Sequence, residues 1–287
     1  MRKLKIINNS KEIILSNAKP FILETIDNTS SNNANIYSSN SAGVDGISID
    51  DVTLQEKLLP INAGIVALNK EDLDRKRAYL SSFFNPKDSF ELIYTNNTTT
   101  RKIKGRVQSI VFQEPVSTIQ KFLIQMLCPN PYWQDLKEIR TNIAMWEGDF
   151  QFPLEIPQEG IEMGHRVSNL ICNIYNAGDV KCGIRIQFKA LASVQNPSFF
   201  NINTRQFIKV NQTLKAGDVL EITTDFSNKR IELIQDNGVR KNVLHWLDLD
   251  SDFLQLNVGD NLFRYDAEKG IDNLEVAIYH TPLYLGV

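Results

Sequence analysis

The chain has 287 residues, of which 42% are hydrophobic and 23% charged, and its formal net charge is −3 at pH 7. This length allows a sizeable core and suggests about two domains. The nearly balanced charge argues against binding of nucleic-acid phosphates, and no apolar run is long enough to span a membrane. The first residues alternate too soon for a signal peptide, so we expect synthesis and folding in the cytosol.

The first half of the sequence predicts strands around one helix. Short β-type runs bounded by turn residues occur at residues 4–8, 12–15, 20–26, 52–58, 61–68, 90–94, 101–112 and 120–128. Residues 28–41 are rich in Asn and Ser and too polar to be buried. We expect this stretch to be a solvated, disordered loop, with an extended arm as the alternative.

The one predicted helix covers residues 69–84. Asn69 is suited to cap its start, and Pro86 excludes helical backbone at the preceding residue. One stripe at helical spacing is predicted to pack inward: Leu73, Arg77, Leu80 and Phe84. Two acid–base pairs stand four residues apart on the exposed side: Glu71 with Arg75, and Asp72 with Lys76.

A turn is predicted at Gly43-Val-Asp-Gly46, where one glycine needs a positive φ. A phosphate-binding loop is rejected here, because no strand-to-helix transition and no lysine follow the glycines.

The pattern changes after Trp133. Residues 148–164 contain Pro153, Pro157 and Gly160 and predict a linker or the first strand of a second unit. We therefore divide the chain into domains at residues 1–140 and 141–287. Later strands are predicted at residues 170–175, 183–191, 206–210, 219–223, 230–235, 253–256, 261–265 and 274–279. Their spacing, without a helical period, predicts an all-β sandwich.

Four turns of the second half place Gly beside Asp or Asn, where left-handed backbone is tolerated. They are Asn176-Ala-Gly-Asp179, Ala216-Gly-Asp218, Asp236-Asn-Gly238 and Val258-Gly-Asp-Asn261. Their carboxylates are separated along the chain and form no alternating ladder, so capping of the turns is favoured over calcium binding.

No catalytic, cofactor-binding or metal-binding residue is predicted. The histidines, His165, His245 and His280, match no catalytic motif, and His245 beside Trp246 is interpreted as a core residue of an apolar strand. Cys128, Cys172 and Cys182 are interpreted as reduced, buried thiols. The alternative is a disulfide between the last two across a predicted hairpin.

The order of several motifs carries a resemblance. The first half contains Gly43-Val-Asp-Gly46, Leu73-Asp-Arg-Lys-Arg77, Phe83-Phe-Asn-Pro-Lys-Asp88 and Cys128-Pro-Asn-Pro-Tyr-Trp133. The second half adds Asn176-Ala-Gly-Asp179, Leu214-Lys-Ala-Gly-Asp-Val-Leu-Glu-Ile222, Phe253-Leu-Gln-Leu-Asn-Val-Gly-Asp-Asn261 and Tyr284-Leu-Gly-Val287. This order resembles the distal tail proteins of siphovirus-type bacteriophages and prophages. The family-pattern positions are Gly43, Asp45, Gly46, Arg75, Pro86, Pro131, Tyr132, Trp133, Gly217, Asp218, Gly259 and Asn261.

The resemblance implies a mainly β protein. Its N-terminal domain would be a β-barrel-like or split-sandwich domain with one α-helix, followed by a C-terminal galectin-like antiparallel β-sandwich. It also implies a homohexameric ring at the virion tail tip, joining the tail tube protein to the baseplate and to the tail-associated lysin or fibre hub. A receptor-binding protein is a further implied partner. No catalytic residues come with the family, so we predict a structural protein and no enzyme.

Two alternatives stay open. The first is that the sandwich is a carbohydrate-binding module for attachment to the host cell wall, in which Trp246, Tyr265 and Tyr284 stack on sugar rings. The competing interpretation is that these aromatic residues fill the core. A small hydrolase within the sandwich is the other alternative, although no acid–base or nucleophile constellation supports it.

Overall fold

The chain forms two compact units in the computed structural model, which describes residues 2–9, 11–43, 45–147, 165–168 and 170–287. Unit 1 comprises Met1–Leu136 and Leu283–Val287, and unit 2 comprises Lys137–Pro282. The first unit thus ends at residue 136, whereas the prediction divided the chain after residue 140. The prediction also assigned residues 283–287 to the second domain, but strand pairing returns them to unit 1.

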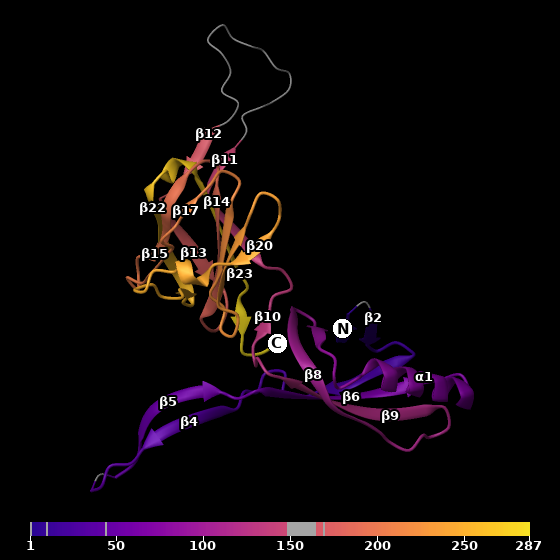
Figure 1. The fold of residues 1–287 in the computed structure, drawn as a ribbon. Coiled ribbons are helices and arrows are strands. Elements are labelled where there is room, and N and C mark those ends of the chain that lie inside the picture. Colours follow the sequence, from indigo (N-terminus) through magenta and orange to yellow (C-terminus); the bar gives the residue numbers. More distant parts are fainter. Residues whose placement is uncertain (1, 10, 44, 148–164, 169) are drawn as a thin grey trace. The chain divides into compact units, whose positions relative to one another are not determined.

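Unit 1 is a β-barrel with one helix and a separate hairpin (Figure 1). Its elements are β1 (Lys3–Asn8), β2 (Lys11–Leu15), β3 (Phe21–Ile26), β4 (Ala34–Ser39), β5 (Ser48–Leu54), β6 (Lys57–Val66), α1 (Lys70–Phe83), β7 (Phe90–Thr95), β8 (Thr100–Phe112), β9 (Ile119–Cys128), β10 (Trp133–Gln134) and β24 (Leu283–Tyr284). The main strands follow the order β2-β1-β7-β8-β9-β6-β3, and a bridge between Ser16 and Ile22 joins the two ends. The predicted barrel-like domain is therefore confirmed.

The long strand β8 bends between its two neighbours in the barrel. Its first half pairs with β7 as far as Gly105, and its second half pairs with β9 from Arg106 onward. A Cβ atom at Gly105 would lie 2.9 Å from the Cys128 Sγ and 2.9 Å from the Leu127 carbonyl oxygen. Only glycine therefore allows β9 to approach this closely at the bend.

The predicted helix is confirmed to within one residue at each end. The Asn69 Oδ1 accepts a hydrogen bond of 2.8 Å from the Asp72 amide, which is the expected N-cap. Leu73, Leu80 and Phe83 are buried against the barrel. Propensity, cap and spacing are local properties of the sequence, and this explains why the helix was predictable.

The prediction for Arg77 was wrong, because this side chain is exposed. Lys76 takes the inward position instead, three residues after Leu73. Its Nζ donates to the Asp72 carboxylate at 2.6 Å and to the Val66 carbonyl oxygen at 3.2 Å. The Asp72–Lys76 pair was predicted, whereas Arg75 lies 3.8 Å from Asp72 rather than beside Glu71.

Pro60 does not divide two strands, as the prediction assumed. β6 runs unbroken through Pro60, which lies one residue beyond the last pair between β3 and β6, Ile26 with Ile61. The missing N–H of proline therefore costs no bond of that ladder. The Asp27 amide still donates to the Pro60 carbonyl oxygen, at 2.9 Å.

Unit 2 is a sandwich of two antiparallel sheets. Its elements are β11 (Ile139–Glu147), β12 (His165–Ser168), β13 (Ile171–Asn176), β14 (Cys182–Ala190), β15 (Val194–Asn201), β16 (Phe207–Lys209), β17 (Thr213–Leu214), β18 (Val219–Thr223), β19 (Arg230–Ile234), β20 (Arg240–Asn242), the 3-10 helix η1 (Leu244–Trp246), β21 (Gln255–Leu256), β22 (Gly259–Lys269), η2 (Ile271–Asn273) and β23 (Leu274–His280). One sheet has the order β12-β11-β23-β14-β18-β19-β20, with β21 on β14. The other has the order β13-β22-β15-β16, with β17 on β15. The predicted sandwich is confirmed, and the galectin-like subtype stays a prediction.

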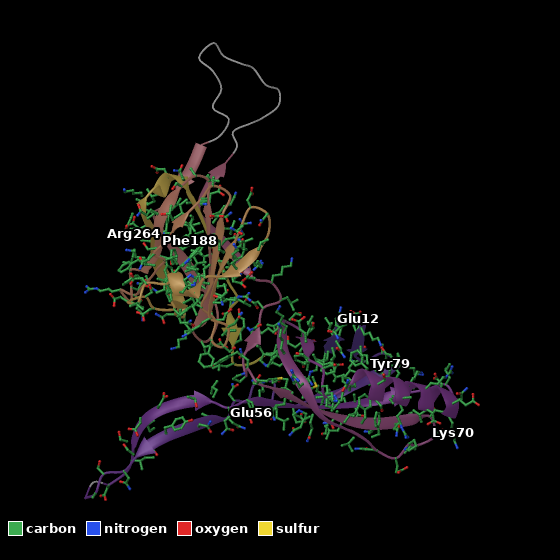
Figure 2. The ribbon with its side chains drawn as sticks, viewed as in Figure 1. Glu12, Glu56, Lys70, Tyr79, Phe188 and Arg264 are labelled. Atoms are coloured by element: carbon green, nitrogen blue, oxygen red, sulfur yellow. The ribbon has the colours of Figure 1, made fainter. Side chains whose placement is uncertain are left out.

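Aliphatic side chains form most of the sandwich core, and a few aromatic rings are packed among them, including Phe188 (Figure 2). Phe188 on β14 is fully buried, and the rings of Phe199 and Phe263 stack with their centroids 4.8 Å apart. β15, which contributes Phe199, was missed by the prediction, because Asn196-Pro197 resembles a turn. The predicted linker at residues 148–164 lies outside the described residues. It joins β11 to β12, which pair with each other within unit 2.

Positive φ is found at five glycines of the predicted turns: Gly43, Gly46, Gly217, Gly238 and Gly259. The turn at residues 176–179 does not follow this pattern, because Gly178 is not in the left-handed region. At Gly238 the turn closes the hairpin between β19 and β20, and the Gln235 amide donates to the Val239 carbonyl oxygen at 3.0 Å. Turn chemistry was predictable because left-handed backbone strongly favours glycine.

Leu80 and Arg77 offer a matched test of the helix stripe. Replacing Leu80 with Ala leaves a cavity in the barrel core, and we expect it to lower the free energy of unfolding by about 2–5 kcal/mol. Arg77→Ala removes an exposed side chain and should change this free energy by less than about 0.5 kcal/mol. Urea unfolding measures both values. A larger loss for Arg77→Ala than for Leu80→Ala would contradict the packing described here.

Candidate assembly surface

The polar stretch that was predicted to be a disordered loop contains an ordered strand. β4 pairs with β5 from Ala34–Leu54 to Ser39–Ser48, and the hairpin projects from the barrel (Figure 1). We call residues 34–54 the arm, and residues 28–33 and 55–57 the arm root. The disordered loop was the wrong alternative and the extended arm the right one, because cross-strand hydrogen bonds satisfy a backbone whose side chains are polar.

The arm has one apolar face. Strand alternation and register place Ile36, Ile49 and Val52 together on it, with exposed fractions of 59%, 60% and 51%. The opposite face carries Tyr37 and Thr53 among polar neighbours. Exposed apolar side chains gathered on one face are typical of a surface that another molecule covers.

The sequence prediction missed this face. The sequence signal was the pair Ile47 and Ile49, two residues apart, but a shift of register places Val52 on the same face three residues after Ile49. The arm is also acidic. Residues 34–54 contain three acidic residues and no Lys or Arg, whereas Lys104 and Arg106 are exposed on β8.

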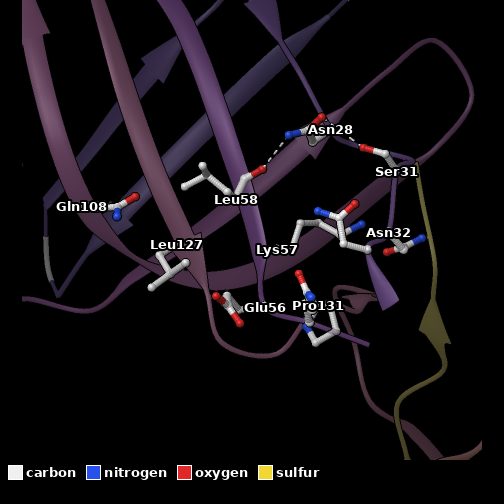
Figure 3. Close-up of a pocket in the computed structure, with 11 residues that line it drawn as sticks. Asn28, Ser31, Asn32, Glu56, Lys57, Leu58, Gln108, Leu127 and Pro131 are labelled. Carbon is white, nitrogen blue, oxygen red and sulfur yellow. Dashed lines mark hydrogen bonds between the residues drawn. The ribbon is translucent and has the colours of Figure 1, made fainter. Parts of the chain in front are cut away.

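A polar pocket of about 290 Å³ lies at the arm root (Figure 3). Its lining includes Asn28, Asn32, Lys57 and Leu58. The Asn28 Nδ2 donates to the Leu58 carbonyl oxygen at 3.1 Å, and the Ser31 hydroxyl donates to the Asn28 Oδ1 at 3.1 Å. These bonds tie the start of the arm to β6.

The family-pattern positions of the first half lie in three separate places. Gly43, Asp45 and Gly46 lie at the tip of the arm, Arg75 and Pro86 are exposed on and after α1, and Pro131 and Tyr132 are half-buried before β10. Trp133 is fully buried, and its indole Nε1 donates to the Thr29 carbonyl oxygen at 2.9 Å. These family-pattern positions support the fold, and they do not form a cluster of reactive side chains.

The family-pattern positions of the second half stabilise turns. At Gly217 the φ is positive, and the Asp218 carboxylate accepts from the Lys215 amide at 2.9 Å. Asn261 follows Gly259 and is buried, with its Nδ2 donating to the carbonyl oxygens of Gly259 and Asn257 at 2.9 and 2.8 Å. Within the described residues, no cluster of three or more His, Cys, Asp or Glu side chains is arranged to hold a metal ion.

The three aromatic candidates for sugar stacking do not share a surface. Tyr265 is 1% exposed in the core of unit 2, and Tyr284 is 8% exposed and belongs to unit 1. The Arg101 guanidinium lies 3.4 Å from the ring centroid of Tyr284. Trp246 is half-buried. Tyr265 and Tyr284 therefore fill cores, which was the alternative interpretation, and present no open face to a sugar.

The two histidines whose side chains are described lie in different elements. His245 lies exposed in η1 rather than buried in an apolar strand, so its predicted place was wrong. Leu244–Trp246 form a short 3-10 helix, although their apolar composition is typical of a strand. His280 is buried in β23, and its burial lowers the pKa of the imidazole. The side chain of His165 lies outside the described residues.

The predicted hairpin between Cys172 and Cys182 was also wrong. Their strands, β13 and β14, lie in different sheets, so the turn at residues 176–179 connects the two layers. All three thiols are free, as predicted, but Cys172 is half-buried rather than buried. Burial raises the pKa of Cys128 and of Cys182 to about 12, and that of Cys172 to about 11.

Comparison with protein families covers both units. The family described as the phage tail protein RIFT-related domain matches residues 8–128, and the C-terminal domain of the siphovirus-type tail component matches residues 177–284. This chain belongs to the siphovirus distal tail protein family. The protein is thus a structural component of a phage tail or baseplate. Comparison with curated proteins gives no match.

Solved structures of distal tail and baseplate proteins share the fold. The crystal structure of SPP1 Dit (gp 19.1), described as a paradigm of the hub adsorption apparatus of phages that infect Gram-positive bacteria, has 14% identity and a TM-score of 0.71, with 98% of each chain covered. A chain of the activated phage P2 baseplate with Ca has 9% identity and a TM-score of 0.54, again with 98% of each chain covered. No helix among the described residues of this family member is long and apolar enough to cross a membrane.

The cysteines give a test of the two cores. Because burial keeps the thiols of Cys128 and Cys182 protonated, we expect these two to react with a thiol reagent at about pH 8 only as fast as the protein unfolds. The folded thiols retain their protons where unfolded thiols ionise, so stability should fall as the pH rises above about 8.5. Absorbance from Ellman's reagent measures the rate, and protein in urea is the control. More than one fast-reacting thiol in the native protein would contradict the burial, since only Cys172 is half-buried.

Proposed function

We propose that this distal tail protein forms a ring, a homohexamer by family resemblance, at the virion tail tip. In this proposal unit 1 builds the ring and unit 2 is a module attached to it. The observation that carries the proposal is the arm, an ordered hairpin whose apolar face is uncovered in the single chain.

The physical argument starts from the stability of the arm. An isolated two-stranded hairpin is marginally stable in water and needs a third strand or a packing surface. Among the residues that the structure describes, Ile36, Ile49 and Val52 are covered by no such surface. Covering them on a neighbouring copy would order the arm and bury apolar area in one step.

A ring follows from the asymmetry of such a contact. The arm of one copy and the barrel of the next are different surfaces, so the contact is heterologous and forms a ring when its rotation closes. The acidic arm and the exposed Lys104 and Arg106 on β8 are of opposite charge, which would favour this pairing and orient it.

The partners follow from the family. We expect the ring to join the tail tube protein on one side and the baseplate, with its tail-associated lysin or fibre hub, on the other. A receptor-binding protein is a further expected partner. The structures that share the fold belong to a hub adsorption apparatus and a baseplate, which supports this place in the virion. Assembly would follow synthesis in the host cytoplasm.

A purely structural role without catalysis belongs to the same proposal. It is supported by the positions of the two histidines whose side chains are described, since His245 is exposed in η1 and His280 is buried in β23. The carbohydrate-binding alternative loses support, because Tyr265 and Tyr284 are buried.

Two paired variants test the role of the arm. Ile36→Asn with Val52→Asn places amides on the apolar face, and losing two aliphatic contacts should weaken self-association about 100-fold. Tyr37→Asn with Thr53→Asn changes the opposite face and serves as the matched control. Mass photometry and electron microscopy of the purified protein measure the oligomer.

Retention of the oligomer in the apolar-face variant would exclude the arm as the subunit contact. A wild-type protein that stays monomeric at high concentration and does not join the tail tube protein would overturn the ring itself. Circular dichroism confirms that each variant keeps its strands.

A further inference from the structure

Residues 283–287, the return segment, are held in unit 1 through their main chain. The Leu285 carbonyl oxygen accepts from the Asn32 Nδ2 and from the Lys57 Nζ, both at 3.0 Å. Arg101 donates to the Gly286 carbonyl oxygen, and the Ser30 hydroxyl donates to the Val287 carbonyl oxygen at 3.2 Å. Three consecutive carbonyl groups are thus bound by side chains.

Apolar contacts add to these bonds. Tyr284 pairs with Trp133 between β24 and β10, and Val287 packs against the barrel core. The fit around Gly286 is close, since a Cβ atom there would lie 2.8 Å from the Ser30 Oγ and 2.9 Å from the Ser30 Cα. The return segment therefore occupies a shaped site.

The donors of this site come from both sides of the arm. Ser30 and Asn32 lie in the connection from β3 to β4, and Lys57 begins β6, shortly after β5. The two sides are also joined to each other, because the Gln55 amide donates to the Asn33 carbonyl oxygen at 2.9 Å. One segment therefore holds both strands of the hairpin where they leave the barrel.

Lys57 makes this contact energetically important. Lys57 is only 4% exposed, and burial lowers the pKa of its ammonium group. A buried charge needs a partner, and the Leu285 carbonyl oxygen supplies one (Figure 3 shows Lys57 beside Asn32 in the pocket). Without the return segment, this ammonium group would lose that partner inside the protein.

We propose that the return segment is a brace that fixes the direction of the arm relative to the barrel. Its donors Ser30, Asn32 and Lys57 are positioning residues for the arm. The brace would keep the apolar face presented to a neighbouring copy, so that assembly requires residues that follow unit 2 in the chain. This last consequence rests on the proposed function, whereas the bracing itself does not.

Gly286→Ala tests the brace in the full chain. The new methyl group would meet the Ser30 backbone, so the return segment must shift and release its bonds. We expect amide hydrogen exchange at residues 29–34 and 54–57 to become about tenfold faster, the change expected for loss of a charge-assisted hydrogen bond. Exchange in β14 and β18 should not change. Gly64→Ala is the control, since its Cβ atom would meet nothing closer than 3.9 Å.

A milder pair of variants covers the case in which Gly286→Ala fails to fold. Asn32→Ala removes one donor to the Leu285 carbonyl oxygen, and Asn40→Ala changes an exposed asparagine within the arm itself. Faster exchange at the arm root in Asn32→Ala only would support the brace. Equal exchange in wild-type and Asn32→Ala proteins would overturn it.

Mass photometry of the same variants separates the two proposals. Faster exchange together with a weaker oligomer supports both the brace and the assembly role of the arm. Faster exchange with an unchanged oligomer supports the brace and contradicts the arm as the subunit contact.

Discussion

Burial of the Trp133 ring obliges its indole N–H to find an acceptor inside unit 1, and that acceptor is the Thr29 carbonyl oxygen. This hydrogen bond joins β10 to the arm root, and the strand pairs of β10 extend the connection to the barrel and to the return segment. Trp133 belongs to β10, which pairs with β8 of the barrel and with β24 of the return segment, while Thr29 opens the arm root. The barrel, the arm and the last strand are therefore organised around one aromatic side chain.

The two units treat their polar groups differently. In unit 2 the polar groups of the turns form hydrogen bonds within the turns. The buried side chains of Asn176 and Asn261, for example, bond main-chain groups two and four residues away. In unit 1 the arm exposes an apolar face and both edges of a two-stranded sheet. The turns of unit 2 are thus satisfied locally, whereas unit 1 exposes the apolar face on which the proposed assembly rests.

Local features were predicted well. The helix, its Asn69 cap and the glycine turns follow from the preferences of a few adjacent residues, and they lie where the sequence indicated. Errors occurred where a residue's environment comes from distant segments. A break between strands was predicted at Pro60, but β6 continues through it. Proline is tolerated there because the neighbouring strand β3 ends one residue away, which the sequence of β6 does not reveal. Lys76 and Arg77 exchanged their expected places because packing against the barrel selects the inward face.

The sequence by itself determined the mainly β class, the single helix, the turn positions and, through the order of its motifs, the family. Each of these depends on short-range patterns or on their order along the chain. Only the tertiary structure decided that residues 34–39 form half of an arm, that Tyr265 and Tyr284 are buried, and that residues 283–287 return to unit 1. These outcomes depend on pairing across many residues, and the free energy of such pairing is set by partners that no local pattern specifies.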